Sequence, residues 1–301
     1  MTTIEPTGQI LGATVRGVDL AKPLGDEDFA TIVRALGQHG VLRFPEQRLE
    51  AAALRDFSRR FGSIQEMLTG YHEPDMPEVG ILSNVIENGR PIGLADAGQD
   101  WHTDMSYNPT IGYLNVLFAV KVPRRNGQVL GATMFVNTQA AWDDLPSELK
   151  TRLGSMTATH DFNKFWENMR RRPGSTRGPM TDEQRRRRPP SVHPIRLVHP
   201  ISGRPVLYCN PGYAIRINEL DEAESERTLQ MLFTHQLQPR YQYTHRWTEG
   251  DVLVWDHIRT LHNAIPDYGP DEHRLMKRCQ VMADRVFEPG FVPALQPVGG
   301  R

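Results

Sequence analysis

Apolar side chains recur along this chain with two different periods. Over residues 26–37 they return every three or four positions, which predicts a helix that ends at Gly37. The same period predicts helices over residues 49–61, 138–153 and 222–236. Short apolar runs bounded by Gly or Pro predict strands. After a strand pair within residues 8–20, these runs span residues 40–45, 79–84, 114–123, 133–137, 195–199, 205–209, 213–217, 241–247, 252–255 and 274–287.

The order of these elements indicates the fold class. Many short strands separated by turn signals favour an all-β double sheet, with the helices added outside it. No internal repeat and no linker interrupts the pattern, so we expect one domain over residues 1–301.

One stretch departs from the pattern. Residues 170–190 are rich in arginine and are interrupted by prolines and glycines. The composition favours an irregular surface insert that is simply solvated; a lid or an anion-attracting flap is the alternative. Nucleic-acid binding is not indicated, because aromatic residues do not alternate with the basic ones.

Composition narrows the classes of partner and compartment. The 301 residues are 39% apolar and 24% charged, and 35 basic residues stand against 36 acidic ones, for a net charge of -1. Such a balance favours neither nucleic acid nor an anionic membrane. Two cysteines, Cys209 and Cys279, make no disulfide framework, and on apolar strands they are expected to be packed rather than reactive. Without a signal peptide or a long apolar segment, we expect a cytoplasmic protein.

A metal site is the strongest chemical signal. His102 and Asp104 are two positions apart, so on an extended strand both side chains would point to the same face. His262, expected in a loop after the strand that ends near Asp256, is the candidate third ligand. Two histidines and one carboxylate form a facial triad that leaves one side of an iron(II) ion open, as non-haem oxygenases require.

Two arginines follow at a strand spacing. Arg274, Met276 and Arg278 would share one face of a strand, with the two arginines ~13 Å apart. Guanidinium groups bind carboxylates and sulfonates in a bidentate manner. The guanidinium groups of Arg274 and Arg278 could therefore bind two different anions, one on each side of a single metal ion.

With these motifs, the sequence resembles the taurine dioxygenase (TauD/TfdA) family of iron(II)- and 2-oxoglutarate-dependent oxygenases. The resemblance covers nearly the whole chain. It is carried by residues 12–20, 60–62, 101–104, 160–162, 255–256, 262 and 274–278. The family fold is a double-stranded β-helix, or jelly roll, with its metal at one open end.

The resemblance implies a role for each matching residue. His102, Asp104 and His262 would be the catalytic metal ligands. Thr133 and Arg274 would bind 2-oxoglutarate, and Arg278 would receive the acidic group of the substrate. The implied reaction uses O2 to hydroxylate a C–H bond and yields succinate and CO2. Family members are commonly dimers or tetramers, so a homo-oligomer is expected.

Departures from the family pattern bear on the substrate. Met67 replaces an expected histidine, Phe165 and Trp166 replace a serine–phenylalanine pair, and Tyr107 lies near the metal motif. Fewer polar contacts and more aromatic ones argue against taurine. They favour a small substrate with an aryl or alkyl body and one carboxylate, sulfonate or sulfate group.

Two alternatives remain open from the residues alone. A zinc-type metallohydrolase could use the same three ligands with an activated water. A non-catalytic jelly-roll binding protein would keep the sheets without needing the metal.

Overall fold

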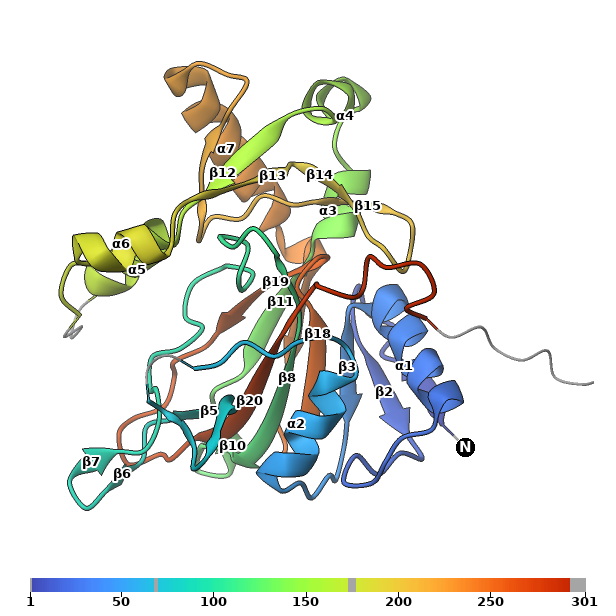
Figure 1. Ribbon diagram of the computed structural model, residues 1–301, viewed down its shortest axis with the longest axis vertical. Coiled ribbons are helices and arrows are strands. Elements are labelled where there is room, and N and C mark those ends of the chain that lie inside the picture. Colours follow the sequence, from blue (N-terminus) through green and yellow to red (C-terminus); the bar gives the residue numbers. More distant parts are fainter. Residues whose placement is uncertain (1, 68–69, 173–176, 293–301) are drawn as a thin grey trace, which may run out of the picture.

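A computed structural model describes residues 2–67, 70–172 and 177–292 of the chain (Figure 1). The described part is mainly β with added helices. Its largest sheet has eight strands, with β18 and β8 near the centre. In sheet order the strands are β1 (Thr3–Pro6), β2 (Ala13–Arg16), β3 (Val41–Phe44), β18 (Val252–Asp256), β8 (Gly112–Lys121), β20 (Leu275–Met282), β5 (Met76–Ser83) and β4 (His72–Glu73).

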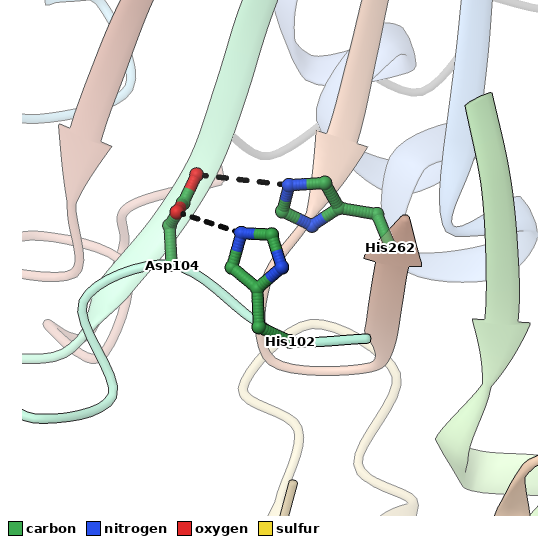
Figure 2. Close-up of side chains that lie close together, drawn as sticks. All are labelled: His102, Asp104 and His262. Atoms are coloured by element: carbon green, nitrogen blue, oxygen red, sulfur yellow. Dashed lines mark ion pairs between the residues drawn. The ribbon is translucent and has the colours of Figure 1, made fainter. Parts of the chain in front are cut away.

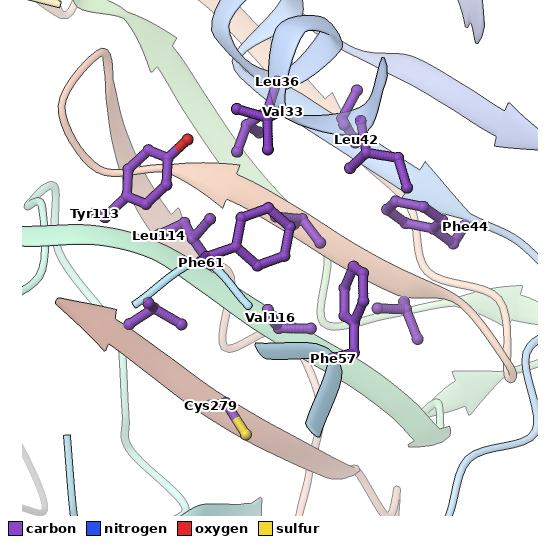
Figure 3. Packing of buried hydrophobic residues seen from close by; sticks show 14 of the residues in the cluster. Val33, Leu36, Leu42, Phe44, Phe57, Phe61, Tyr113, Leu114, Val116 and Cys279 are labelled. Atoms are coloured by element: carbon purple, nitrogen blue, oxygen red, sulfur yellow. The ribbon is translucent and has the colours of Figure 1, made fainter. Parts of the chain in front are cut away.

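Alternation along the central strands gives this sheet two buried faces. On β18, Val252 and Val254 join one apolar cluster, whereas Leu253 and Trp255 join another. The first face is covered by helices α1 (Asp26–His39) and α2 (Ala51–Arg59), as Figure 3 shows for the aromatic and aliphatic side chains packed there. The central strands are therefore apolar on both sides, as expected for strands buried within a layered core.

A second sheet of three strands packs on the other face. It consists of β17 (Gln242–His245), β11 (Thr133–Asn137) and β19 (Thr260–Ala264), with β11 in the middle. Phe135 of β11 and Tyr243 of β17 belong to the same cluster as Trp255 and Met276 of the large sheet. The space between these two sheets contains the residues of the candidate site.

The remaining elements form a third region, seen beyond one end of the large sheet in Figure 1. Helices α3, α4 and α7 share an apolar cluster there with several short strands. The elements are β12 (Thr157–His160), β13 (Ser191–Pro194), β14 (Arg196–Val198), β15 (Pro205–Leu207), β16 (Ala214–Ile217), α3 (Thr138–Asp143), α4 (Ser147–Leu153), α5 (Phe162–Arg170), α6 (Asp182–Arg187) and α7 (Glu222–Gln236). Smaller elements are β6 (Ile86–Glu87), β7 (Arg90–Pro91), β9 (Arg124–Arg125), β10 (Gln128–Val129) and the 3-10 helix η1 (Pro239–Tyr241).

Most predicted elements are confirmed, with shifted ends. Helix α1 continues past Gly37 to His39 and is capped by Gly40, whose φ of 71° is the left-handed conformation that glycine adopts readily. The prediction of a single helix over residues 138–153 is wrong. The segment forms two helices, α3 and α4, which are separated at Pro146, because proline lacks the N–H that a helix interior requires.

The arginine-rich stretch is also more regular than expected. Within residues 170–190, α6 is held by a capping box in which Thr181 and Gln184 bond each other's backbone N–H groups. Residues 173–176 lie outside the described part of the chain. Among the described residues, no helix is both long and apolar enough to cross a membrane.

Candidate active site

The backbone brings the two halves of the metal motif together. His262 lies on β19 opposite Phe135 of β11, and not in a loop as the sequence suggested. His102 forms an isolated antiparallel bridge with it. The His262 N–H donates to the His102 carbonyl at 2.8 Å, and the His102 N–H donates back at 3.1 Å. The segment that carries His102 is thereby attached to the three-stranded sheet.

The expected strand through His102 and Asp104 is wrong. After the bridge at His102 the chain enters a turn at Asp104, and Met105 has a φ of 60°. The turn is fixed by contacts distant in sequence. The Thr103 hydroxyl donates to the His257 carbonyl at 2.7 Å, and the Asp100 N–H donates to the Asn263 side chain at 2.9 Å. The two ligand candidates converge because of this turn rather than through strand alternation.

Three buried side chains meet at one point. One ligand atom each from His102, Asp104 and His262 lies within 4.8 Å of the others. The His102 Nε2 is 3.3 Å from Asp104 Oδ1, and the His262 Nε2 is 3.8 Å from Asp104 Oδ2. Figure 2 shows both imidazole rings turned toward the carboxylate. Two imidazoles and one carboxylate at this spacing fit a divalent transition metal with open positions.

Neighbouring groups orient these ligand atoms. The His102 Nδ1 lies 2.7 Å from the Asp100 carbonyl, which can only accept, so Nδ1 carries the proton and Nε2 keeps its lone pair. The Asn115 amide donates to Asp104 Oδ2 at 2.8 Å. Asn115 was not predicted as a site residue. Its signal is a polar side chain inside the apolar run of β8, where it is fully buried.

The pKa shifts of the site residues favour the binding of a cation. Burial raises the pKa of Asp104, but the interactions of its carboxylate with His102, His262 and Arg278 hold this pKa well below its usual range. Burial lowers the pKa of His262 well below its usual range. The site therefore presents an ionised carboxylate and a neutral imidazole, the protonation states in which both groups bind metal.

His257 lies just behind this group. Its Nε2 is 4.0 Å from Asp104 Oδ2, and burial lowers its pKa to about 4. It is a neutral, buried ring beside the carboxylate.

Arg278 lies on β20, whereas Arg274 immediately precedes this strand. The Arg278 side chain is 10% exposed, with Nη1 3.8 Å from Asp104 Oδ2. Met67 touches it, with Sδ 3.9 Å from Arg278 Nη2. The structure thus brings Met67 and Arg278 together beside the candidate metal site.

Arg274 is buried just before the start of β20. Its side chain packs against Gly131, where an added Cβ would lie 3.3 Å from the arginine Nε. Gly131 leads into β11, and the Thr133 hydroxyl accepts a hydrogen bond from the Trp247 indole at 3.0 Å. Among the described residues the Arg274 Nε has no hydrogen-bond partner. The segments that carry Arg274 and Thr133 are therefore adjacent, and one nitrogen of the buried guanidinium, Nε, has no acceptor there.

Aromatic rings line the other side of the triad. Phe165 is 4.9 Å from the His102 ring and 5.1 Å from Tyr213, measured between ring centroids. Tyr213 is in turn 4.9 Å from Tyr107. Phe162 stacks on Tyr213 and meets Tyr107 edge-on. Its other ring contact is Trp166, whose indole donates to the Gly178 carbonyl. Tyr107 and Phe165 thus join the site, whereas Trp166 lies one ring away. Phe162 and Tyr213 were not predicted.

The fold and this triad define the class of protein. A family model described as "Taurine catabolism dioxygenase TauD, TfdA family" matches residues 3–280. The chain belongs to this family and is an alpha-ketoglutarate-dependent dioxygenase that requires Fe(II), 2-oxoglutarate and O2. Neither the zinc hydrolase nor the non-catalytic binding protein has support.

Individual relatives cover nearly the whole chain. Pentalenolactone F synthase of Streptomyces avermitilis is 33% identical over 294 residues, which are 94% of each protein. The (S)-phenoxypropionate/alpha-ketoglutarate-dioxygenase of Sphingobium herbicidovorans is 30% identical and covers 95% of this chain and 96% of its own. A solved taurine dioxygenase from Burkholderia xenovorans is 26% identical, has a TM-score of 0.75, and covers 94% of this chain and 90% of its own.

Proposed function

We propose that this enzyme hydroxylates a small organic acid with an aryl or alkyl body, and that taurine is not its substrate. The observation that carries the proposal is the pairing of Arg278 with an aromatic wall around one buried triad. A cation beside aromatic rings suits an anion on an apolar body. The relative from Sphingobium, named for phenoxypropionate, acts on a molecule of this kind.

In this proposal His102, Asp104 and His262 hold Fe(II). When bound, the metal with 2-oxoglutarate and O2 supplies the oxidant, and 2-oxoglutarate leaves as succinate and CO2. The protein contributes position and protonation state. Asp100 and Asn115 fix the His102 ring and the Asp104 carboxylate by hydrogen bonds, so the ligand atoms are aligned before the metal arrives.

Arg274 and Thr133 are proposed to bind the distal carboxylate of 2-oxoglutarate. The buried guanidinium lacks an acceptor for its Nε among the described residues, and a carboxylate would provide one. The Thr133 hydroxyl already accepts from Trp247, so its own proton is free to be donated to the same anion.

Arg278 is proposed to bind the acidic group of the substrate. Tyr107 and Phe165 would pack on its apolar body, and Met67 would fill space beside the guanidinium. Trp166 was also predicted to contact the substrate. Its place behind Phe162 supports an indirect role, in which it holds the aromatic wall rather than the substrate.

We further propose that the eight-stranded and three-stranded sheets form the double-stranded β-helix of the family within one domain. The apolar cluster shared by the two sheets supports this assignment. Homo-oligomerisation, expected from the family, is retained as part of the proposal.

Anaerobic absorption spectroscopy tests the proposal. Fe(II) and 2-oxoglutarate added to the wild-type enzyme should produce a visible charge-transfer band, and small aryl and alkyl acids should perturb it. His102→Ala should abolish the band, because one imidazole ligand is lost. A wild-type protein loaded with iron but without any band would contradict the assignment of the three ligands and of the 2-oxoglutarate site.

A further inference from the structure

The arginine-rich segment, defined as residues 177–188, packs against the loop that precedes His102. Arg177 makes a bidentate ion pair with Asp96, at 2.6 and 3.0 Å. Its guanidinium also lies 5.0 Å from the Trp166 ring centroid. Just before this segment, Arg172 pairs with Asp100 at 2.7 Å. One ion pair thus attaches the segment, and a second attaches the chain just after α5, to the loop that precedes His102.

The segment ends with Arg188 over the aromatic wall. The Arg188 guanidinium carbon lies 4.2 Å from the centroid of Phe162. Phe162 packs on Tyr107 at 4.8 Å and on Tyr213 at 6.4 Å. A single ring therefore separates Arg188 from the two tyrosines that lead to the candidate metal site.

Arg188 differs from Arg185 and Arg187 in lacking an acidic partner among the described residues. On the same helix Arg187 pairs with Glu183 at 2.5 Å, and Arg185 lies 3.6 Å from Asp182. Within residues 2–67, 70–172 and 177–292, no carboxylate forms an ion pair with Arg188. Its charge is half-buried over an aromatic ring and is free to receive an anion.

Two cations act on the same phenol. Burial raises the pKa of Tyr107 to about 12, whereas the positive charges of Arg188 and Arg278 oppose the rise. The same two arginines oppose the raised pKa of Tyr213. Both guanidiniums are therefore within electrostatic reach of one aromatic cluster. Arg278 approaches it from β20, beside Asp104, and Arg188 approaches from the end of α6.

We propose that Arg188 is a specificity-determining residue that binds a second anionic group of the substrate. This inference rests on the proposed function and refines it. The preferred substrate is a dianion with an aromatic body, one acidic group on Arg278 and the other on Arg188. The apolar rings between the two arginines receive the body. The alternative is that Arg188 only covers Phe162, in which case the charge of the substrate's far end would not matter.

Two probes of similar shape distinguish these outcomes. Phenoxyacetate carries one carboxylate, and 4-carboxyphenoxyacetate carries a second one at the opposite end of the ring. Binding of each is measured to the anaerobic Fe(II)–2-oxoglutarate enzyme by perturbation of the charge-transfer band and by calorimetry. The wild type should bind the dianion about tenfold more tightly, the effect of one charge-assisted hydrogen bond.

Arg188→Gln should remove this preference and leave phenoxyacetate binding within about twofold. Arg188→Lys should restore part of it. Arg187→Gln is the matched control, since that arginine points to solvent on the same helix. Equal affinity of the wild type for both probes, equal losses for both probes in Arg188→Gln, or binding of neither probe would overturn the inference. A missing charge-transfer band in the wild type would instead remove the proposed function itself.

Discussion

Asn115 offers the sharpest test of how the protein prepares its metal ligands. From β8 in the large sheet, the Asn115 side-chain amide donates a hydrogen bond to Asp104 Oδ2 at 2.8 Å, and Asn115 is fully buried. Asn115→Ala removes this donor and leaves the carboxylate free to rotate. Partners that orient metal ligands in this way typically contribute 10–100-fold to metal affinity, or about 1.4–2.7 kcal/mol. We therefore expect the Fe(II) dissociation constant to rise by that factor.

The folded protein should also become less stable. A buried hydrogen bond to a charged group contributes about 1.5–3 kcal/mol, and the smaller side chain leaves space in a packed strand. The matched control is Asn218→Ala. Asn218 bonds Thr157 and Thr159 in a different sheet, so its loss should lower stability without changing metal affinity.

Anaerobic Fe(II) titration in the presence of 2-oxoglutarate measures the affinity, and thermal melting of the metal-free protein measures the stability. The reasoning fails if Asn115→Ala melts earlier but binds Fe(II) as tightly as the wild type. That result would mean that His102 and Asp104 hold their geometry through the backbone bridge and the turn alone.

Three further outcomes follow from buried groups elsewhere. Burial and the neighbouring charges lower the pKa of His160 to about 3, so the neutral ring stabilises the folded protein fully above pH 6.5, and this contribution is lost as the pH falls. Melting curves should show about 2 kcal/mol less stability at pH 5 than above pH 6.5. His160→Gln should flatten this pH dependence. Burial raises the pKa of both Cys209 and Cys279 to about 12, so a thiol reagent at pH 8 should label neither in the native protein and both in urea. His199 donates to Asp256 at 2.7 Å with both side chains fully buried, so His199→Phe should cost about 3 kcal/mol in chemical denaturation, and an unchanged midpoint would show that the pair is dispensable.

The sequence was sufficient to select the three side chains that meet in the structure. His102, Asp104 and His262 were recognised from residue type and spacing, and the structure brings them to one point. Arg274 and Arg278 were expected on one face of a strand, but β20 begins at Leu275 and its pairing with β8 is irregular between Leu275 and Met276, so strand alternation does not place Arg274. Local rules also produced the errors. Helical period alone joined α3 to α4, although Pro146 stood between them.

What the sequence did not predict depends on contacts between distant segments. No local pattern at Asp104 predicts a turn, because the turn is fixed by His257 and Asn263 from the far end of the chain. Asn115 looked like one polar residue in a buried strand until its partner was known. Arg188 looked like one of many solvated arginines, and only the packing of α6 against Phe162 sets it apart.

The arrangement of the site explains why the ligands can come from such different elements. His262 is fixed by the β19–β11 pairing, and His102 is attached to His262 by two backbone hydrogen bonds, so one sheet positions the backbone of both residues. Asp104 follows two residues later and is held by Asn115 from the large sheet. The triad therefore spans the space between the two sheets. Any substitution that changes how the sheets pack, such as one at Phe135 or Trp255, should alter metal affinity through this geometry even though neither side chain is a proposed ligand.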